Sequence, residues 1–209
     1  MNRRRYDSPV RDEAARLTRR RILEVARESF LTLGYGQTTI SAIAAGAGVS
    51  AQTVYSRFGS KAAILKDVYD VALVGDDEPV PMAARPEFHQ LGQATDVGVL
   101  LDSYARLARL MAERMRPLLE LVWGVRAVEP DLDELARTAA VERRIGSTMF
   151  AEHLVNGGFA RPGLDVEDAV ALIWVLNAPE VYLLQVRDGQ LSDDAYELWL
   201  AGALRASLV

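Results

Sequence analysis

The amino-acid sequence predicts an all-α protein of about nine helices. Apolar residues recur at spacings of three and four through most of the chain, which is the period of a helix with one buried face. Glycines, prolines and capping Ser, Thr or Asp residues separate these segments. No segment shows the apolar and polar alternation that is typical of a strand, and no internal repeat is present.

The composition fits a folded chain without metal or disulfide chemistry. Of the 209 residues, 50% are hydrophobic and 25% are charged, which is enough for a sizeable core. The absence of cysteine excludes disulfides, thiolate catalysis and cysteine zinc sites. His89 and His153 are far apart in the sequence and lack ligand spacing, so we expect neither a metal nor another cofactor.

The sequence predicts neither membrane insertion nor secretion. No apolar run approaches the roughly 20 residues that a bilayer requires. Arg3, Arg4 and Arg5 are not followed by the apolar stretch of a signal peptide. We therefore expect a cytoplasmic protein with no membrane partner.

Charge is distributed unevenly along the chain. Residues 1–72 carry 12 Lys or Arg and 7 Asp or Glu, whereas residues 73–209 carry 12 and 22. The first part is therefore basic and the second acidic. This asymmetry is either a chance bias of a charged N-terminal segment or the sign that only the first part meets a polyanion.

The first helix is predicted from about residue 9 to residue 33. Asp7-Ser8-Pro9 supplies a cap followed by a proline in the first turn, and Gly34 suits the C-terminal end. Its inward positions are apolar: Leu17, Ile22, Val25, Ala26 and Phe30. Four arginines give it the densest positive charge in the chain: Arg16, Arg19, Arg20 and Arg21. They form either a solvated face or, as we favour for one or two of them, contacts to phosphates.

Two short helices separated by a glycine turn follow. The first, at about 39–46, has Thr38 or Thr39 as its cap and an apolar inner face. Gly48 occupies the turn position where a positive φ is needed, which glycine adopts most cheaply. Ser50 caps the second helix, 51–58, which turns Val54 and Phe58 inward because they lie four residues apart.

The outer face of residues 51–58 carries groups suited to reading DNA. An amide, hydroxyls, a phenol and one cation can contact base edges or phosphates. These groups belong to Gln52, Thr53, Tyr55, Ser56 and Arg57. Lys61 follows at the start of the next helix, where an ammonium and a helix N-terminus can hold one phosphate. The segment therefore predicts a DNA-binding helix-turn-helix.

Residues 16–66 as a whole resemble the N-terminal DNA-binding domain of the TetR family of bacterial transcriptional regulators. The resemblance rests on these elements: Phe30, Gly34-Tyr35, Thr38-Thr39, Ile43-Ala44, Ala47-Gly48-Val49-Ser50, Thr53-Val54-Tyr55, Phe58 and Ser60-Lys61. It implies that the following residues lie at or near DNA: Thr39, Ser50, Ala51, Gln52, Thr53, Tyr55, Arg57 and Lys61. Tyr55 and Lys61 are then expected on phosphates, and Ala51 and Gln52 on bases. Many relatives carry Lys or Arg near position 51 and an aromatic residue near 57, whereas this chain has Ala51 and Arg57. Its base preference therefore cannot be transferred from a relative.

The remainder of the chain is predicted to be a helical body. We expect helices at about 62–74, 97–115, 117–125, 132–156, 166–187 with a kink at Pro179, and 193–207, and a loop from 75 to 96. The sequence thus divides into a helix-turn-helix domain, residues 1–60, and a ligand-binding and dimerisation domain, residues 61–209.

The last two helices have more apolar surface than one packed face requires. We expect them to pair with a second copy of the chain through Val181, Leu184, Trp199 and Leu200. The resemblance implies the same, because family members dimerise through their last two helices.

A second set of large apolar and polar residues is suited to a small-molecule site. The candidates are Tyr104, Met111, Trp123, Phe150, Trp174 and Asn177. Each is also compatible with an ordinary core position. Asn177 could instead satisfy the carbonyl that Pro179 leaves without its amide partner.

The sequence therefore predicts a ligand-responsive transcriptional regulator and not an enzyme. We expect a homodimeric repressor on a palindromic double-stranded DNA operator, released by a small apolar or amphipathic effector. The alternative is a DNA-binding regulator that a protein partner controls. No catalytic spacing of nucleophile, base or metal ligands is present.

Overall fold

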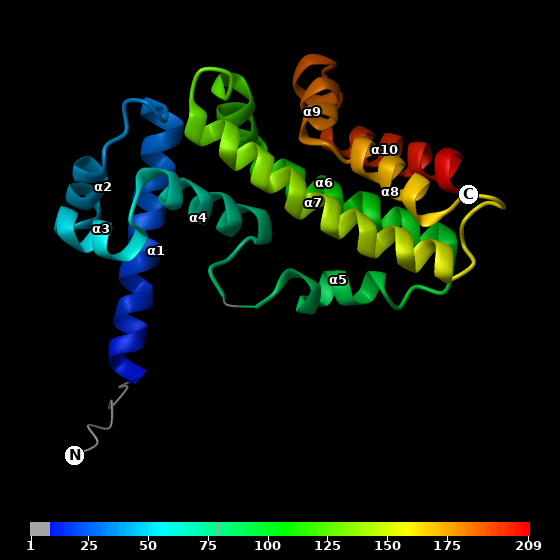
Figure 1. Cartoon of the computed structure of the whole chain (residues 1–209), viewed down its shortest axis with the longest axis horizontal. Coiled ribbons are helices and arrows are strands. Elements are labelled where there is room, and N and C mark those ends of the chain that lie inside the picture. Colours follow the sequence, from blue (N-terminus) through cyan, green and yellow to red (C-terminus); the bar gives the residue numbers. More distant parts are fainter. Residues whose placement is uncertain (1–8, 79) are drawn as a thin grey trace. The chain divides into compact units, whose positions relative to one another are not determined.

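The structure, a computed structural model, describes residues 9–78 and 80–209, and every regular element among them is helical (Figure 1). The elements are α1 (Pro9–Leu33), α2 (Ile40–Ala47), α3 (Ala51–Phe58), α4 (Lys61–Val74), the 3-10 helix η1 (Met82–Ala84), α5 (Pro86–Leu91), α6 (Val97–Val125), α7 (Pro130–Asn156), α8 (Val166–Leu176), α9 (Pro179–Tyr182), the π-helix η2 (Leu183–Asp188) and α10 (Asp193–Leu208). The predicted all-α class is confirmed. Asp7 and Ser8, the expected cap of α1, lie outside the described residues.

Contacts divide the chain into two compact units, with the boundary between Ala72 and Leu73. All of α4 except its last two residues therefore belongs to the N-terminal unit. The boundary predicted from the sequence lies earlier, after residue 60. α4 is tied to this unit by the ion pair of Asp67 with Arg19 and by the hydrogen bond from Lys61 to the carbonyl of Tyr35.

The N-terminal unit is built around the buried side of α1. Ile22, Ala26 and Phe30 are fully buried, and α1 packs against α2, which packs against α3. The ring of Phe30 lies 5.6 Å from that of Tyr35 at the corner between α1 and α2. Thr38 is buried there and donates a 2.8 Å hydrogen bond to the carbonyl of Gly34. This contact fixes the direction in which the chain enters α2.

The C-terminal unit is a bundle of four long helices. α6 packs against α7 and α10, and α8 also packs against α7 and α10, so the four form a closed ring (Figure 1). The interior is mainly aliphatic, and its fully buried members include Leu100, Leu118, Leu132, Leu154, Ile173, Leu200 and Leu204. A bundle of this kind places side chains from all four helices around one interior.

α6 corrects the prediction of two helices separated near residue 116. It runs without interruption from Val97 to Val125 and contains Pro117. A proline removes one helical hydrogen bond and crowds the preceding turn. Pro117 itself is exposed, whereas Met115, Leu118 and Leu119 on the other side are buried. Burial of these neighbours therefore holds the helix together across the proline.

The segment predicted as one kinked helix at 166–187 is instead three elements. α8 ends at Leu176, Asn177 and Ala178 form a break, and Pro179 begins α9 in the first-turn position that proline favours. The π-helix η2 then continues to Asp188. The proline therefore starts a new helix and does not bend an old one.

The connection from residue 75 to residue 96 is more structured than the predicted loop, because it contains η1 and α5. Arg85 closes it through two hydrogen bonds to Asp76, of 2.6 and 2.8 Å. The hydrogen bonds from Arg85 and from the backbone of Glu78 lower the pKa of Asp76 to about 2. The carboxylate is therefore ionised throughout the neutral range.

Arg114 of α6 meets the C-terminal end of α4 beside this connection. Its Nη1 donates a 3.4 Å hydrogen bond to the carbonyl of Leu73. Gly75 has a φ of 96°, and a Cβ at this position would lie only 2.4 Å from the same Nη1. The positive φ favours glycine, and a Cβ here would also displace the guanidinium of Arg114.

Within the described residues no single helix has the length and apolar composition to cross a membrane. Val166–Leu176 together with Pro179–Asp188 meets those criteria only as a pair bent by 41°.

Candidate nucleic-acid interface and bundle interior

The helix-turn-helix has the local geometry that the sequence predicts. Thr39, and not Thr38, caps α2 by accepting from the backbone N–H of Ala42. Gly48 ends α2 in the left-handed conformation, with a φ of 68°. Ser50 caps α3 by accepting a 3.0 Å hydrogen bond from the backbone N–H of Thr53. These caps fix the angle between the two helices.

α3 has one buried and one exposed side. Val54 is fully buried and Phe58 is half-buried, so both face the unit's core as predicted. The exposed residues are Gln52, Tyr55, Ser56 and Arg57, whereas Ala51 and Thr53 are half-buried. The hydroxyls of Ser50 and Thr53 lie 2.8 Å apart and are hydrogen-bonded to each other. An amide, a phenol and a guanidinium are therefore presented to the outside along a single short helix.

Lys61 lies at the start of α4, next to the corner between α1 and α2. Its Nζ donates a 2.7 Å hydrogen bond to the carbonyl of Tyr35. The same ammonium lies 4.0 Å from the centroid of the Tyr35 ring, within the range of a cation–π interaction. The cation is thus held at a defined position at the N-terminus of α4.

The four clustered arginines of α1, residues 16 and 19–21, differ in their partners. Arg16 pairs with Glu13 at 2.9 Å, Arg19 with Asp67 at 2.9 Å and Arg20 with Glu24 at 3.8 Å. Arg21 has no carboxylate partner among the residues that the structure describes. Its side chain lies beside the turn of the helix-turn-helix, where a Cβ on Gly48 would be 3.8 Å from its Nη2. Arg21 is therefore the cation of α1 that is available beside the turn.

The interior of the bundle contains a polar cluster, defined as Tyr104, Arg143, Ser147, Trp174 and Asn177. Asn177 donates a 2.5 Å hydrogen bond to the hydroxyl of Tyr104. Nη1 of Arg143 donates to Oδ1 of Asn177 at 2.7 Å and to the carbonyl of Trp174. The cluster therefore joins α6, α7 and the end of α8.

Aromatic rings enclose this cluster. The Phe150 ring lies 4.0 Å from that of Tyr104, and the guanidinium carbon of Arg143 lies 4.7 Å from the centroid of the Trp174 ring. Burial raises the pKa of Tyr104 to about 12, so its phenol stays protonated at neutral pH. Ser147 is 1% exposed and donates a 3.0 Å hydrogen bond to the carbonyl of Arg143. Charged, neutral polar and aromatic groups thus meet at one place, where Ser147 and Phe150 are buried and the other members are half-buried.

Four of the six residues predicted to bind an effector lie at this cluster: Tyr104, Phe150, Trp174 and Asn177. Met111 lies two turns further along α6, on the side of Tyr104. Trp123 lies about 28 Å from Tyr104 along the axis of α6, given 1.5 Å per residue. Its ring contacts Arg126, with 5.5 Å between the guanidinium carbon and the ring centroid. Trp123 therefore does not belong to the cluster.

Sequence reasoning missed Arg143 and Ser147. Both lie on the side of α7 that carries Phe150, because 143, 147 and 150 are spaced by four and three residues. An arginine in an inward position of an amphipathic helix was the available signal.

Asn177 also does not cap the carbonyl expected of it. The carbonyl of Val175 accepts from the backbone N–H of Ala178. The carbonyl at the end of α8 that accepts from a side chain is that of Trp174, and its donor is Arg143. A side chain of α7, that of Arg143, thus stabilises the break before Pro179.

The residues predicted for dimerisation differ in exposure. Leu184 is 61% exposed, and Val181 and Trp199 are half-buried. Leu200 is fully buried within the single chain, so it has no exposed surface there to offer a partner. The residue of α10 that faces outward is Leu198, which is 76% exposed.

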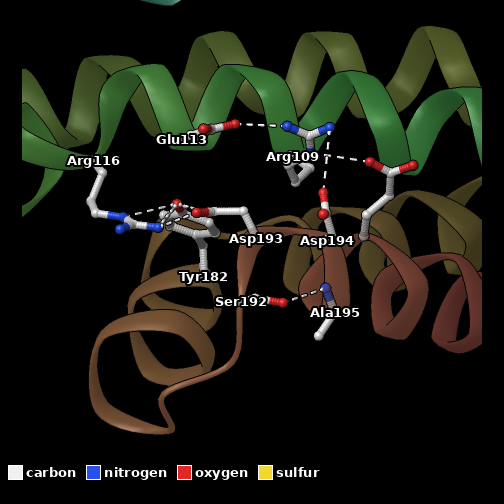
Figure 2. Close-up of polar contacts among 9 residues, drawn as sticks. Arg109, Glu113, Arg116, Tyr182, Ser192, Asp193, Asp194 and Ala195 are labelled. Atoms are coloured by element: carbon white, nitrogen blue, oxygen red, sulfur yellow. Dashed lines mark hydrogen bonds and ion pairs between the residues drawn. The ribbon is translucent and has the colours of Figure 1, made fainter.

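A network of charges ties the start of α10 to α6 (Figure 2). Arg116 donates to Asp193 at 2.6 Å and to the hydroxyl of Tyr182, which itself donates to Asp193 at 2.5 Å. Arg109, two turns earlier on α6, contacts Glu113 and Glu197 at 2.7 and 3.0 Å. Burial raises the pKa of Asp193, but the hydrogen bonds from Tyr182 and Arg116 outweigh it and lower this pKa overall. The network fixes how α10 lies on α6.

Comparison with known proteins identifies the class to which this fold belongs. Residues 22–68 match the model of the bacterial regulatory proteins of the tetR family. An uncharacterized HTH-type transcriptional regulator, YdeS of Bacillus subtilis (strain 168), is 27% identical over 184 residues, 88% of this chain and 84% of that protein. The protein is therefore a DNA-binding transcriptional regulator of the helix-turn-helix class.

Solved structures show the same fold over nearly the whole chain. A putative TetR-family transcriptional regulator from Rhodococcus sp. has a TM-score of 0.68 at 17% identity, covering 92% of this chain and 98% of that one. The SmeT–triclosan complex has a TM-score of 0.69 at 20% identity, covering 92% of both chains. A putative regulator from Saccharomonospora viridis in complex with choline has a TM-score of 0.64 at 21% identity, covering 91% and 97%. The DNA-binding segment of the chain thus matches the TetR family model, and the chain has the fold of these regulators over nearly its whole length.

Proposed function

We propose that the protein is a homodimeric, ligand-responsive repressor that acts in the cytoplasm on a palindromic operator. The observation that carries the DNA-binding half of this proposal is the exposed face of α3. Gln52, Tyr55 and Arg57 point outward from a helix whose N-terminus is capped and held in place. Such a helix can enter a major groove and contact base edges.

Base reading and phosphate contact fall to different residues in this proposal. Ala51, Gln52 and Thr53 occupy the first turn of α3 and face the bases. Phosphates are contacted by Thr39, Ser50 and Lys61, which lie at helix starts, and by Tyr55 in the middle of α3. Arg57 lies at the edge of this surface. α3 carries a single cation, so specificity depends mainly on hydrogen bonds from the amide and the hydroxyls.

Dimerisation doubles the short site that one α3 can read. A twofold symmetric dimer would place two copies of α3 in successive major grooves, about 34–36 Å apart. Leu184 on η2 and Leu198 on α10 are highly exposed apolar residues near the C-terminal end of the chain, and Val175 on α8 is 54% exposed. We infer that these three, with Val181 and Trp199, pair with the same surface of a second copy.

Effector control is assigned to the C-terminal unit. The cluster around Tyr104, Arg143 and Asn177 combines aromatic walls with a few convergent polar groups, as small-molecule sites do. Two structures of the same fold are complexes with small molecules, choline and triclosan. A ligand that binds the DNA-competent and the released states with free energies about 1–3 kcal/mol apart would suffice to regulate binding.

The test is footprinting of the purified protein on the DNA beside its gene. We expect protection of an inverted repeat whose half-sites are centred about one helical turn apart or a multiple of it. Tyr55→Phe should weaken this protection, whereas Tyr69→Phe, at a buried tyrosine of the same unit, should not. Protection of a site without twofold symmetry would contradict the dimeric assignment. Calorimetry with metabolites and a pull-down for protein partners would separate effector control from the alternative, control by a protein.

A further inference from the structure

We propose that the effector is an organic anion, with a carboxylate or an equivalent group on an apolar body, and that Arg143 and Asn177 bind the anionic group. This inference rests on the proposed function, because it names the ligand class of the sensor. It is carried by the half-buried guanidinium of Arg143, whose Nη1 donates to two uncharged acceptors and which lies over the ring of Trp174.

The first step concerns the partners of Arg143. Its Nη1 donates to the amide oxygen of Asn177 and to the backbone carbonyl of Trp174, both of which are neutral. A guanidinium forms stronger, bidentate hydrogen bonds with a carboxylate because both partners are charged and their geometries match. An anionic ligand that reaches this position therefore offers Arg143 a better acceptor than either neutral group.

The second step concerns the remaining contacts of such a ligand. Asn177 supplies an amide N–H that now goes to the hydroxyl of Tyr104, 2.5 Å away, and can be redirected to an anion. The Tyr104 phenol is protonated at neutral pH and does not repel a negative charge. The rings of Phe150 and Trp174 provide an apolar surface for the rest of the molecule. The donors thus favour an anion over a neutral or cationic analogue of the same shape.

The third step links binding to the shape of α8. Arg143 places a cation and a donor at the C-terminal end of α8, where the helix dipole is negative. The backbone N–H of Ala178 bonds to Val175, so it is not the donor for the Trp174 carbonyl. A ligand that draws Arg143 away removes this cap. The break at Asn177–Ala178, which leads into α9 and η2, is then free to change its geometry.

This arrangement predicts a direction of regulation. Val181 and Leu184 follow the break directly, and Val175 precedes it. These are residues that we assign to the dimer surface, so a change at the break alters how two chains pair. The anion binds more tightly to the state in which Arg143 has left the carbonyl of Trp174. Binding of the anion therefore increases the population of that state.

The experiment measures the binding of matched acids and amides to the full-length protein by calorimetry. The probes are straight-chain carboxylates of eight, ten and twelve carbons and benzoate, each compared with its primary amide. We expect at least one acid to bind about tenfold or more tightly than its amide, as a charged hydrogen bond implies. Equal affinities of every acid and its amide, or no binding of any acid, would overturn the proposal.

Variants assign the discrimination to Arg143. Arg143→Met should abolish the preference for the acid, and Arg143→Lys should keep part of it while retaining the charge. Arg144→Met is the matched control, because Arg144 is exposed and lies further from the same Trp174 ring, at 5.9 Å. Its preference should match that of the wild type. A preserved preference in both Arg143 variants would overturn the proposal even if Arg143→Met were less stable.

Asn177→Asp provides a test without any ligand. The new carboxylate would lie beside Arg143 and form a permanent ion pair with its guanidinium. We expect this variant to bind the acids no better than their amides and to bind operator DNA less tightly than the wild type in the absence of ligand. Unchanged DNA affinity together with an unchanged preference for acids would contradict the proposed link. Wild-type DNA binding is measured separately, so failure of this inference leaves the proposed DNA-binding function intact.

Discussion

Lys61 donates a 2.7 Å hydrogen bond to the backbone carbonyl of Tyr35, and its ammonium lies 4.0 Å from the centre of the same residue's ring. One cation therefore connects the start of α4 with the corner between α1 and α2. The same ammonium is the group that we expect to meet a phosphate. A single side chain thus contributes both to the structure of the N-terminal unit and to the contact that we expect with DNA.

Lys61→Met should weaken binding to operator and unrelated DNA by the same factor. Loss of one phosphate contact should reduce the slope of log K against log salt by about 0.9. We also expect a loss of about 0.5–2 kcal/mol in the free energy of unfolding, because the contact with Tyr35 is lost. Fluorescence anisotropy at several salt concentrations measures the first effect and urea denaturation the second. An unchanged salt slope would remove Lys61 from the phosphate-contacting residues.

Arg21→Gln should reduce the salt slope by about 0.9 and leave the unfolding free energy unchanged, because Arg21 lies beside the turn without a carboxylate partner in the described structure. Arg19→Gln is the matched control. It breaks the ion pair with Asp67 and should cost about 0.2–1 kcal/mol of stability with little effect on the slope. The opposite pattern in the two variants would show that Arg19, not Arg21, faces the phosphates.

Gln52→Ala should change which bases are selected more than it changes affinity for random DNA. A glutamine amide can hydrogen-bond to a base edge, and such a contact discriminates by about 1–3 kcal/mol. Selection from a randomised duplex library, followed by sequencing, measures the preference. A selection profile equal to that of the wild type would mean that Gln52 does not read bases.

Leu198→Glu and Leu184→Glu should give monomers that remain folded, because both leucines are exposed in the single chain. Leu200→Ala should instead destabilise the fold by about 2–5 kcal/mol, since it removes buried side-chain volume from the core. Sedimentation velocity reports the association state and thermal denaturation the stability. Dimeric sedimentation of both glutamate variants would rule out this surface as the interface.

The network of Arg116, Tyr182 and Asp193 should make stability depend on pH in the acid range. The pKa of Asp193 is lowered in the folded state, so its contribution is complete above the pKa of the unfolded state and is lost as pH falls through the folded pKa. Asp193→Asn should reduce the free energy of unfolding by about 1–3 kcal/mol at pH 7. The difference from wild type should shrink below about pH 4. A difference that is constant from pH 7 to pH 3 would contradict the ionised role of Asp193.

The sequence predicted the helix-turn-helix well because its determinants are local. A capping hydroxyl at Thr39 or Ser50 and a left-handed Gly48 act within four residues of the chain they shape. The two-sided character of α3 follows equally from the spacing of Val54 and Phe58. These rules operate before any long-range contact forms, so one sequence suffices to apply them.

The body was predicted less well because its details depend on contacts between distant helices. α6 continues through Pro117 since its neighbours are buried against other helices, and this burial cannot be read from the proline itself. Arg143 lies 31 residues before the Trp174 carbonyl that it caps. Leu200 is buried and Leu198 is exposed because the inward face of α10 depends on how it docks on α6.

The close approach of Gly75 to Arg114 predicts which mutants a genetic screen should return. Any side chain at this position would push the guanidinium of Arg114 away from the carbonyl of Leu73, at the end of the helix that leads out of the DNA-binding unit. Substitutions there leave every residue of α3 and of the interior cluster intact. A screen for mutants that bind operator and effector but no longer connect the two should therefore return changes at Gly75 and Arg114.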